Sequence, residues 1–160
     1  MLKESTRIMD IDATDRRILT VLQKEGRITN AELSERINLS PSACHRRVQR
    51  LEEDGYIAGY VALLNTRKMA RPTTVFVEIT LQGQADDVLD HFEREVAKVP
   101  DIMECHLMAG SADYLLKVLV QDTDDFARIH RQYLARLPGV AQMQSSFALR
   151  TVLSTTAIAV

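Results

Sequence analysis

The chain has 160 residues, of which 46% are hydrophobic and 26% charged, and its formal net charge is −2. These values are ordinary for a globular protein with one domain or two small ones, and no stretch approaches the roughly 18 apolar residues of a membrane span. The charged beginning, MLKESTRIMD, also predicts neither a signal peptide nor a membrane anchor. Residues 1–68 hold twelve Lys/Arg against ten Asp/Glu, whereas residues 69–160 hold eight against twelve. This asymmetry fits a nucleic-acid module joined to a different domain.

The first third of the chain has the capping residues and apolar spacing of three short helices. We expect them over residues 12–26, 29–38 and 40–55, with Asp12, Thr29 and Ser40 as N-caps, Gly26 and Gly55 as stops, and Pro41 at the first helical position of the third. Thr29 and Glu32 have the spacing of a capping box. Only Asn38 and Leu39 separate the second helix from the third, and so short a connection is typical of a helix-turn-helix.

A different pattern follows the third helix. The stretch YIAGYVALLN alternates and has a central Gly59, which predicts a small hairpin, or wing, over residues 56–65. Pro72 and its polar neighbours then predict a linker over residues 66–73. The sequence therefore predicts a winged helix-turn-helix domain over residues 1–65.

Residues 74–160 predict the order strand–helix–strand–strand–helix–strand. This βαββαβ order is typical of a ferredoxin-like α+β sandwich, in which both helices cover one face of the sheet. The other face, with Phe76 and Met108, would form an apolar surface, and we expect it to pair with a second chain.

The third helix separates an apolar face from a polar one. At about 100° per residue, Cys44, Val48 and Leu51 share the inner face. The opposite face carries Ser42, Arg46 and Gln49, flanked by His45 and Arg50. Arginine matches guanine and glutamine matches adenine in the major groove, so this face suits base reading.

Phosphates would be met at the edges of the same helix, by Arg47, Arg50 and the N-terminus capped by Ser40. The alternative is a solvated charged face on which Arg46 and Arg50 pair within the helix with Glu53 and Asp54. The two-residue turn before the helix and the wing after it favour DNA reading.

The helical region together with ALLN, VFVEITL, ECHLMAGSADYLLKV and LPGV resembles the Lrp/AsnC family of bacterial and archaeal transcription regulators. The matching stretches cover most of the chain in the family's order. The resemblance implies a winged helix-turn-helix that binds double-stranded DNA and a C-terminal domain, residues 74–160, that binds an amino acid. It also implies homodimers that assemble into tetramers, octamers or larger rings.

The turn Gly110-Ser111-Ala112-Asp113 joins two predicted strands. Backbone N–H groups at such a turn suit the carboxylate of an amino acid, and an aspartate suits its ammonium. The resemblance implies that this turn forms the effector site between dimers, with His106, Met108, Ala109, Gly110, Asp113 and Tyr114 as the candidate residues. The alternative is an ordinary tight turn. Met143 and Ser145 stand where relatives often carry Thr-x-Thr, which leaves the identity of the effector open.

No catalytic, metal-binding or cofactor-binding pattern is present. His91 and His130 lack ligand spacing to Cys44 or Cys105, and both cysteines, which stand in apolar patterns, are expected to be buried thiols. We therefore expect a cytoplasmic regulator that is not an enzyme. The alternatives are an architectural protein that wraps DNA and senses no ligand, and a small metabolic enzyme, for which we find no nucleophile or acid–base pair.

Overall fold

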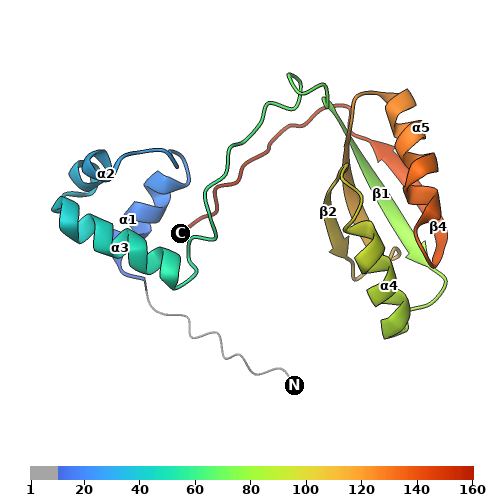
Figure 1. Cartoon of the computed structure of the whole chain (residues 1–160), viewed down its shortest axis with the longest axis horizontal. Coiled ribbons are helices and arrows are strands. Elements are labelled where there is room, and N and C mark those ends of the chain that lie inside the picture. The colour runs from blue at the N-terminus through green and yellow to red at the C-terminus, as the bar shows by residue number, and fades with distance from the viewer. Residues whose placement is uncertain (1–10) are drawn as a thin grey trace. The chain divides into compact units, whose positions relative to one another are not determined.

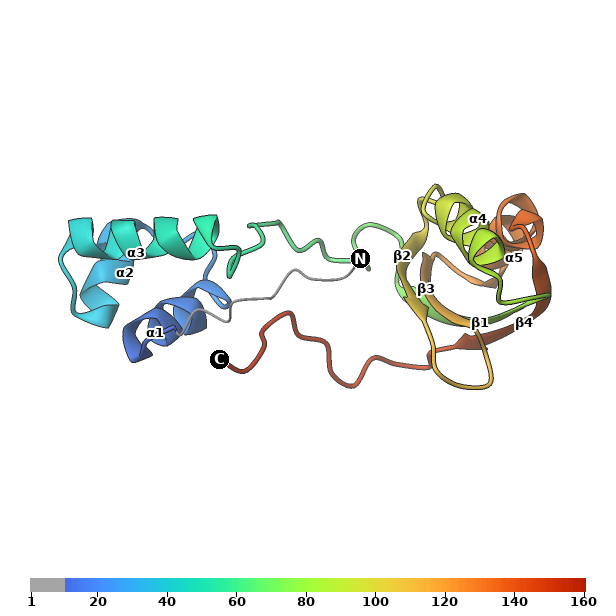
Figure 2. The same ribbon diagram turned by 90° about the horizontal axis from the view of Figure 1, so that it is seen from below.

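The computed structural model describes residues 11–160, which form two units (Figure 1, Figure 2). Among the described residues, the first unit comprises residues 11–63 and 153–160, and the second comprises residues 64–152. The last eight residues therefore lie with the first unit, although the sequence places them in the C-terminal domain. The first ten residues, where we expect no signal peptide, lie outside the described part. No helix among residues 11–160 is long and apolar enough to cross a membrane.

Three helices form the first unit: α1 (Ala13–Leu22), α2 (Asn30–Ile37) and α3 (Pro41–Glu53). The predicted N-caps are confirmed, because the side chains of Asp12, Thr29 and Ser40 each accept a hydrogen bond from a backbone N–H of the helix that follows. The helices enclose a core of six buried side chains: Ile18, Leu19, Leu33, Ile37, Cys44 and Leu51. The apolar spacing in the sequence thus gives the correct inner faces.

The helix ends are partly as predicted. Gly55 follows α3 with a φ of 76°, a left-handed conformation that glycine adopts without steric cost. Asn38 ends α2 with a φ of 56° and so makes the sharp turn into α3. Gly26 does not stop α1, which ends at Leu22, because Lys24 and Glu25 form turn hydrogen bonds to the Val21 carbonyl instead.

The predicted hairpin over residues 56–65 is wrong. The structure has no strand there, and the side chains of Val61 and Leu63 are 83% and 72% exposed. A hairpin needs its two halves to pair with each other as strands, and residues 56–65 form no such pair. The C-terminal tail contacts the end of α1 and does not pair with residues 56–65 as a strand. The Gln23 side-chain amide donates to the carbonyl of Ile158 and accepts from its N–H.

The second unit has the predicted βαββαβ order. Its elements are β1 (Thr73–Leu81), α4 (Asp86–Val96), β2 (Ile102–Leu107), β3 (Tyr114–Val120), α5 (Thr123–Gln132), a short 3-10 helix (Leu134–Arg136) and β4 (Val140–Phe147). The strands form one antiparallel sheet in the order β2-β3-β1-β4. Both helices lie on the same side of the sheet (Figure 2), which confirms the ferredoxin-like sandwich.

The core of this unit lies between the helices and the two central strands. Val75, Val77, Leu116 and Val118 are fully buried on that face. The opposite face of the same strands has no layer over it within the described chain, and Phe76 on it is 39% exposed. The sheet therefore buries one face and leaves the other open.

The two cysteines differ in environment. Cys44 is fully buried in the core of the first unit, as predicted. Cys105 is exposed, which corrects the prediction. It pairs across the strands with buried Leu116 and so faces the helix side, but β2 is an edge strand and is not fully covered there.

The capping box of α2 gives a first prediction. Thr29→Ala removes a hydroxyl that accepts from the Glu32 N–H, so we expect the first unit to lose about 1 kcal/mol of unfolding free energy. Urea unfolding followed by circular dichroism measures the loss. Thr20→Ala is the control, because Thr20 is exposed in the last turn of α1 and its hydroxyl only donates to the Arg16 carbonyl. An equal loss in both variants would contradict a specific role for the cap.

Candidate nucleic-acid interface and ligand turn

The α3 helix is held on one side by apolar packing and at its start by polar contacts. Cys44 and Leu51 are fully buried in the core of the first unit, and Val48 packs beside them. The amide of Asn30, the first residue of α2, donates to the Pro41 carbonyl over 2.9 Å. These contacts fix the start of α3 against α2, as the helix-turn-helix geometry requires.

The outward face of α3 carries the side chains predicted to read bases. Ser42, His45, Arg46 and Gln49 are all exposed. Gln49 donates to Glu53 over 2.8 Å, whereas Arg46 makes no hydrogen bond or ion pair with any residue from 11 to 160. The structure thus brings these four side chains together on one surface, where Arg46 is uncommitted.

Arg47 and Arg50 have partners that the sequence interpretation missed. Arg47 Nη1 lies 2.7 Å from an Asp12 carboxylate oxygen and 2.8 Å from one of Asp15, and Arg50 Nη2 contacts the other oxygen of Asp15. Both arginines are therefore tied to the start of α1. The alternative, in which Arg46 and Arg50 pair within the helix with Glu53 and Asp54, is wrong. Arg50 bonds instead to Asp15 of α1, and Arg46 forms no ion pair with any residue from 11 to 160.

The signal for these pairs was present in the stretch DATD. Its two aspartates begin α1 at the N-cap and at the third helical position, where they complete a capping box. The Asp15 N–H, and next the Arg47 guanidinium, lower the pKa of Asp12 to about 2. What the sequence does not reveal is that the packing of α1 against α3 brings these acids to the arginines.

Three arginines also line a shallow hollow of about 380 Å³ on the same unit, with the lining Leu39, Ala43, Arg46, Arg47 and Arg50. Two of these arginines, Arg47 and Arg50, are already paired with acids, so Arg46 is the one lining arginine without an acidic partner among residues 11–160.

The turn between β2 and β3 is organised by Asp113. Its backbone N–H donates to the Ile79 carbonyl, and its carbonyl accepts from the N–H of Met108. Its carboxylate accepts from the Leu81 N–H and from the Gln84 amide, each over 2.7 Å. The predicted ligand for an ammonium group thus already holds the end of β1.

Gly110 lies at the exposed tip of this turn. Its φ is not left-handed, and a Cβ built on it would meet no atom of the described chain within 4 Å. The conformation and packing of the chain itself therefore do not require a glycine here.

The other candidate ligand residues are divided between two surfaces. Met108 and Ala109 are exposed next to Gly110, and His106 is exposed on the open face of the sheet, 3.2 Å from Glu104. Tyr114 is only 1% exposed on the opposite, helix-facing side. Tyr114 therefore does not share a surface with the tip of the turn.

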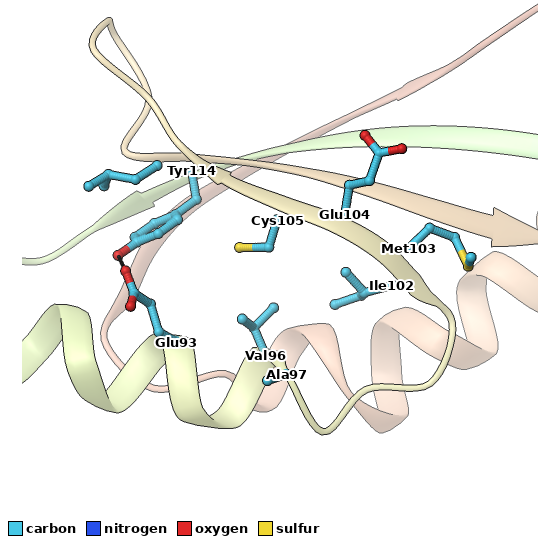
Figure 3. A pocket seen from close by; sticks show the side chains of 9 residues that line it. Glu93, Val96, Ala97, Ile102, Met103, Glu104, Cys105 and Tyr114 are labelled. Atoms are coloured by element: carbon cyan, nitrogen blue, oxygen red, sulfur yellow. Dashed lines mark hydrogen bonds between the residues drawn. The ribbon is translucent and has the colours of Figure 1, made fainter. Parts of the chain in front are cut away.

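Tyr114 lines a cavity of about 420 Å³ between α4 and β2 (Figure 3). Its hydroxyl donates to Glu93 over 2.7 Å, and burial with this hydrogen bond raises the pKa of Tyr114. The sulfur of Cys105 points into the same space (Figure 3), where its apolar surroundings and the Glu93 carboxylate raise the pKa of Cys105 to about 11. No pattern in the sequence indicates this cavity, because it arises where α4 does not cover the edge strand.

Comparisons with known proteins match both units. Residues 11–58 match the winged helix-turn-helix DNA-binding family model, and residues 74–158 match the Lrp/AsnC ligand binding domain. The chain is 47% identical over 143 residues to the leucine-responsive regulatory proteins of Salmonella typhimurium and Escherichia coli K12, which covers 89% of this chain and 87% of each relative.

Solved structures agree with these matches. A transcriptional regulator from Neisseria meningitidis in complex with L-Met superposes with a TM-score of 0.88 at 38% identity, over 93% of this chain and 96% of that one. An AsnC family regulator from Agrobacterium tumefaciens gives a TM-score of 0.89 at 34% identity, over 92% and 96%. The chain therefore belongs to the Lrp/AsnC family of transcription regulators, with a helix-turn-helix DNA-binding domain followed by a ligand-binding domain.

Proposed function

We propose that the outward face of α3 reads base edges in the major groove through Ser42, His45, Arg46 and Gln49. The observation that carries this proposal is the uncommitted guanidinium of Arg46 on a capped helix whose inner face is fully packed. Arginine at such a position forms two parallel hydrogen bonds to guanine. The capped start of α3 at Ser40 lies where the DNA backbone would pass, whereas Arg47 and Arg50 are already paired with acids at the start of α1.

The protein acts as a homodimer or a larger assembly of dimers. The open sheet face with Phe76, and the exposed apolar side chains of Val61, Leu63 and Leu64, support self-association. A two-fold dimer presents two copies of α3, which read the two halves of a pseudo-palindromic operator in the cytoplasm.

An amino acid binds at the turn of Met108–Asp113. The open space at Gly110 supports this site. The L-Met complex of the Neisseria meningitidis regulator and the similarity to leucine-responsive regulatory proteins make methionine and leucine the first ligands to test. Occupancy of the turn would act on β1 through Asp113, because that carboxylate holds the Leu81 N–H. A coupling of about 1–3 kcal/mol is typical of such regulation and changes operator affinity several-fold or more.

The second candidate is an architectural protein that wraps DNA without sensing an amino acid. It is favoured by the two hydrogen bonds that already engage the Asp113 carboxylate and by Met143, which packs against the core of the second unit. Isothermal titration with the twenty amino acids separates the two candidates, since the architectural protein gives no binding heat.

Arg46→Ala should weaken binding to an operator, selected from random DNA with the wild-type protein, by about 1–3 kcal/mol, because a bidentate base contact is lost. Binding to unrelated DNA should change far less. Arg131→Ala, at an exposed position of α5, is the matched control for the loss of one positive charge. Unchanged operator affinity in Arg46→Ala would remove this residue from the reading surface.

Gly110→Val should weaken amino-acid binding roughly tenfold or more, because the added bulk occupies the tip of the turn. The melting temperature should stay unchanged, since a Cβ there meets no atom of the described chain within 4 Å. Isothermal titration and thermal unfolding measure the two effects. Ala127→Val, which adds bulk on exposed α5, is the control. Normal ligand affinity in Gly110→Val would place the ligand elsewhere.

Light scattering after size exclusion should give the mass of a dimer or more for the wild type. Phe76→Lys should lower that mass, because it replaces an exposed aromatic ring on the open sheet face by a charge beside Lys117, its cross-strand neighbour. Asp90→Lys, at an exposed position of α4, controls for the added positive charge and should keep the wild-type mass. A wild-type monomer, or an unchanged mass in Phe76→Lys, contradicts pairing through this face.

A further inference from the structure

We propose that Asp15 is a positioning residue that sets the DNA specificity of α3 by holding Arg47 and Arg50 away from phosphates. The inference rests on the proposed reading of DNA by α3. It assigns to one residue of α1 the control over which arginines of α3 are available for binding.

The carboxylate of Asp15 is the most buried charged group described in the first unit. It is 1% exposed, and both of its oxygens are engaged. Oδ1 accepts from Arg47 over 2.8 Å, while Oδ2 accepts from Arg50 and, over 3.3 Å, from the N–H of Asp12. A buried carboxylate is stable only when it is paired in this way. Moving Arg47 or Arg50 away from Asp15 therefore costs folding free energy.

The two arginines are less buried than their partner. The side chain of Arg47 is 31% exposed and that of Arg50 is 49% exposed, so each guanidinium reaches the surface beside Arg46. Without Asp15 they would offer two positive charges to any passing phosphate. Such contacts add affinity that is independent of sequence.

The cluster also fixes the orientation of α3. Arg47 and Arg50 stand three residues apart on the same flank of the helix, and both bond to the first turn of α1. These ion pairs add a restraint on the rotation of α3 about its own axis to those given by the apolar core and by the Asn30–Pro41 hydrogen bond. A helix restrained in this way presents Arg46 and Gln49 to bases at a fixed angle.

The charges within the cluster cancel. Asp12 and Asp15 together neutralise Arg47 and Arg50, which leaves Arg46 as the one arginine of α3 without an acidic partner among the described residues. The helix therefore carries one reading arginine rather than three competing ones. Specific binding is favoured over non-specific binding by this arrangement.

Asp15→Asn tests the assignment in the full-length protein. We expect non-specific DNA affinity to rise and its logarithmic dependence on salt to steepen by roughly 1–2, because each freed arginine gains about one phosphate contact. Operator affinity should fall, so the ratio of specific to non-specific affinity should drop roughly tenfold or more. In a triple variant that adds Arg47→Gln and Arg50→Gln, the gain in non-specific affinity should disappear.

Two further variants keep the test decisive if Asp15→Asn folds poorly. Arg50→Gln in the wild-type background should leave the salt dependence unchanged, whereas a slope reduced by about 0.9 would show that Arg50 contacts phosphate and would overturn the proposal. Asp12→Asn, at a half-exposed position, frees only one bond of Arg47 and should give a smaller steepening than Asp15→Asn.

Failure of this inference is distinguishable from failure of the proposed function. If the wild type shows no preference for its selected operator, DNA reading by α3 is wrong. If the wild type is specific and Arg46→Ala weakens it, but Asp15→Asn changes neither the ratio nor the salt slope, only the role of Asp15 is wrong.

Discussion

The structure of the first unit depends on the position of α3, which packs against the core on one face and is exposed to solvent on the other. Its inner face closes a core that includes Cys44 and Leu51, while its outer face remains polar and exposed. The ion pairs to Asp12 and Asp15 lie at the boundary between these two faces. Because Arg47 and Arg50 are engaged in these pairs, Arg46 is the arginine of the outward surface that has no acidic partner among the described residues.

The second unit is governed by a different constraint, the one-sided cover of its sheet. Both helices pack on one face of β2-β3-β1-β4, so the other face has no partner within the described chain. The edge strand β2 is only partly covered even on the helix side, which leaves Cys105 exposed and opens the cavity beside Tyr114. Self-association and ligand binding are both ways in which such surfaces become buried.

The elements that depend on local pattern were predictable from the sequence. The N-caps Asp12, Thr29 and Ser40 and the βαββαβ order follow from residue type and spacing. The predictions that failed concern contacts that residue type and spacing alone do not determine. The hairpin over residues 56–65 lacked a partner strand, and the pairs of Arg47 and Arg50 join residues more than thirty positions apart. Tyr114 likewise stands beside the predicted ligand turn in sequence, yet its side chain faces the core.

We propose that an amino acid and an operator bind to this protein and that each changes the affinity for the other. The operator dissociation constant, measured with and without each of the twenty amino acids at saturation, tests this coupling. The coupling predicts that at least one amino acid changes this constant by roughly 5–150-fold, and that the operator changes the affinity for that amino acid by the same factor. An operator affinity that no amino acid alters would contradict it.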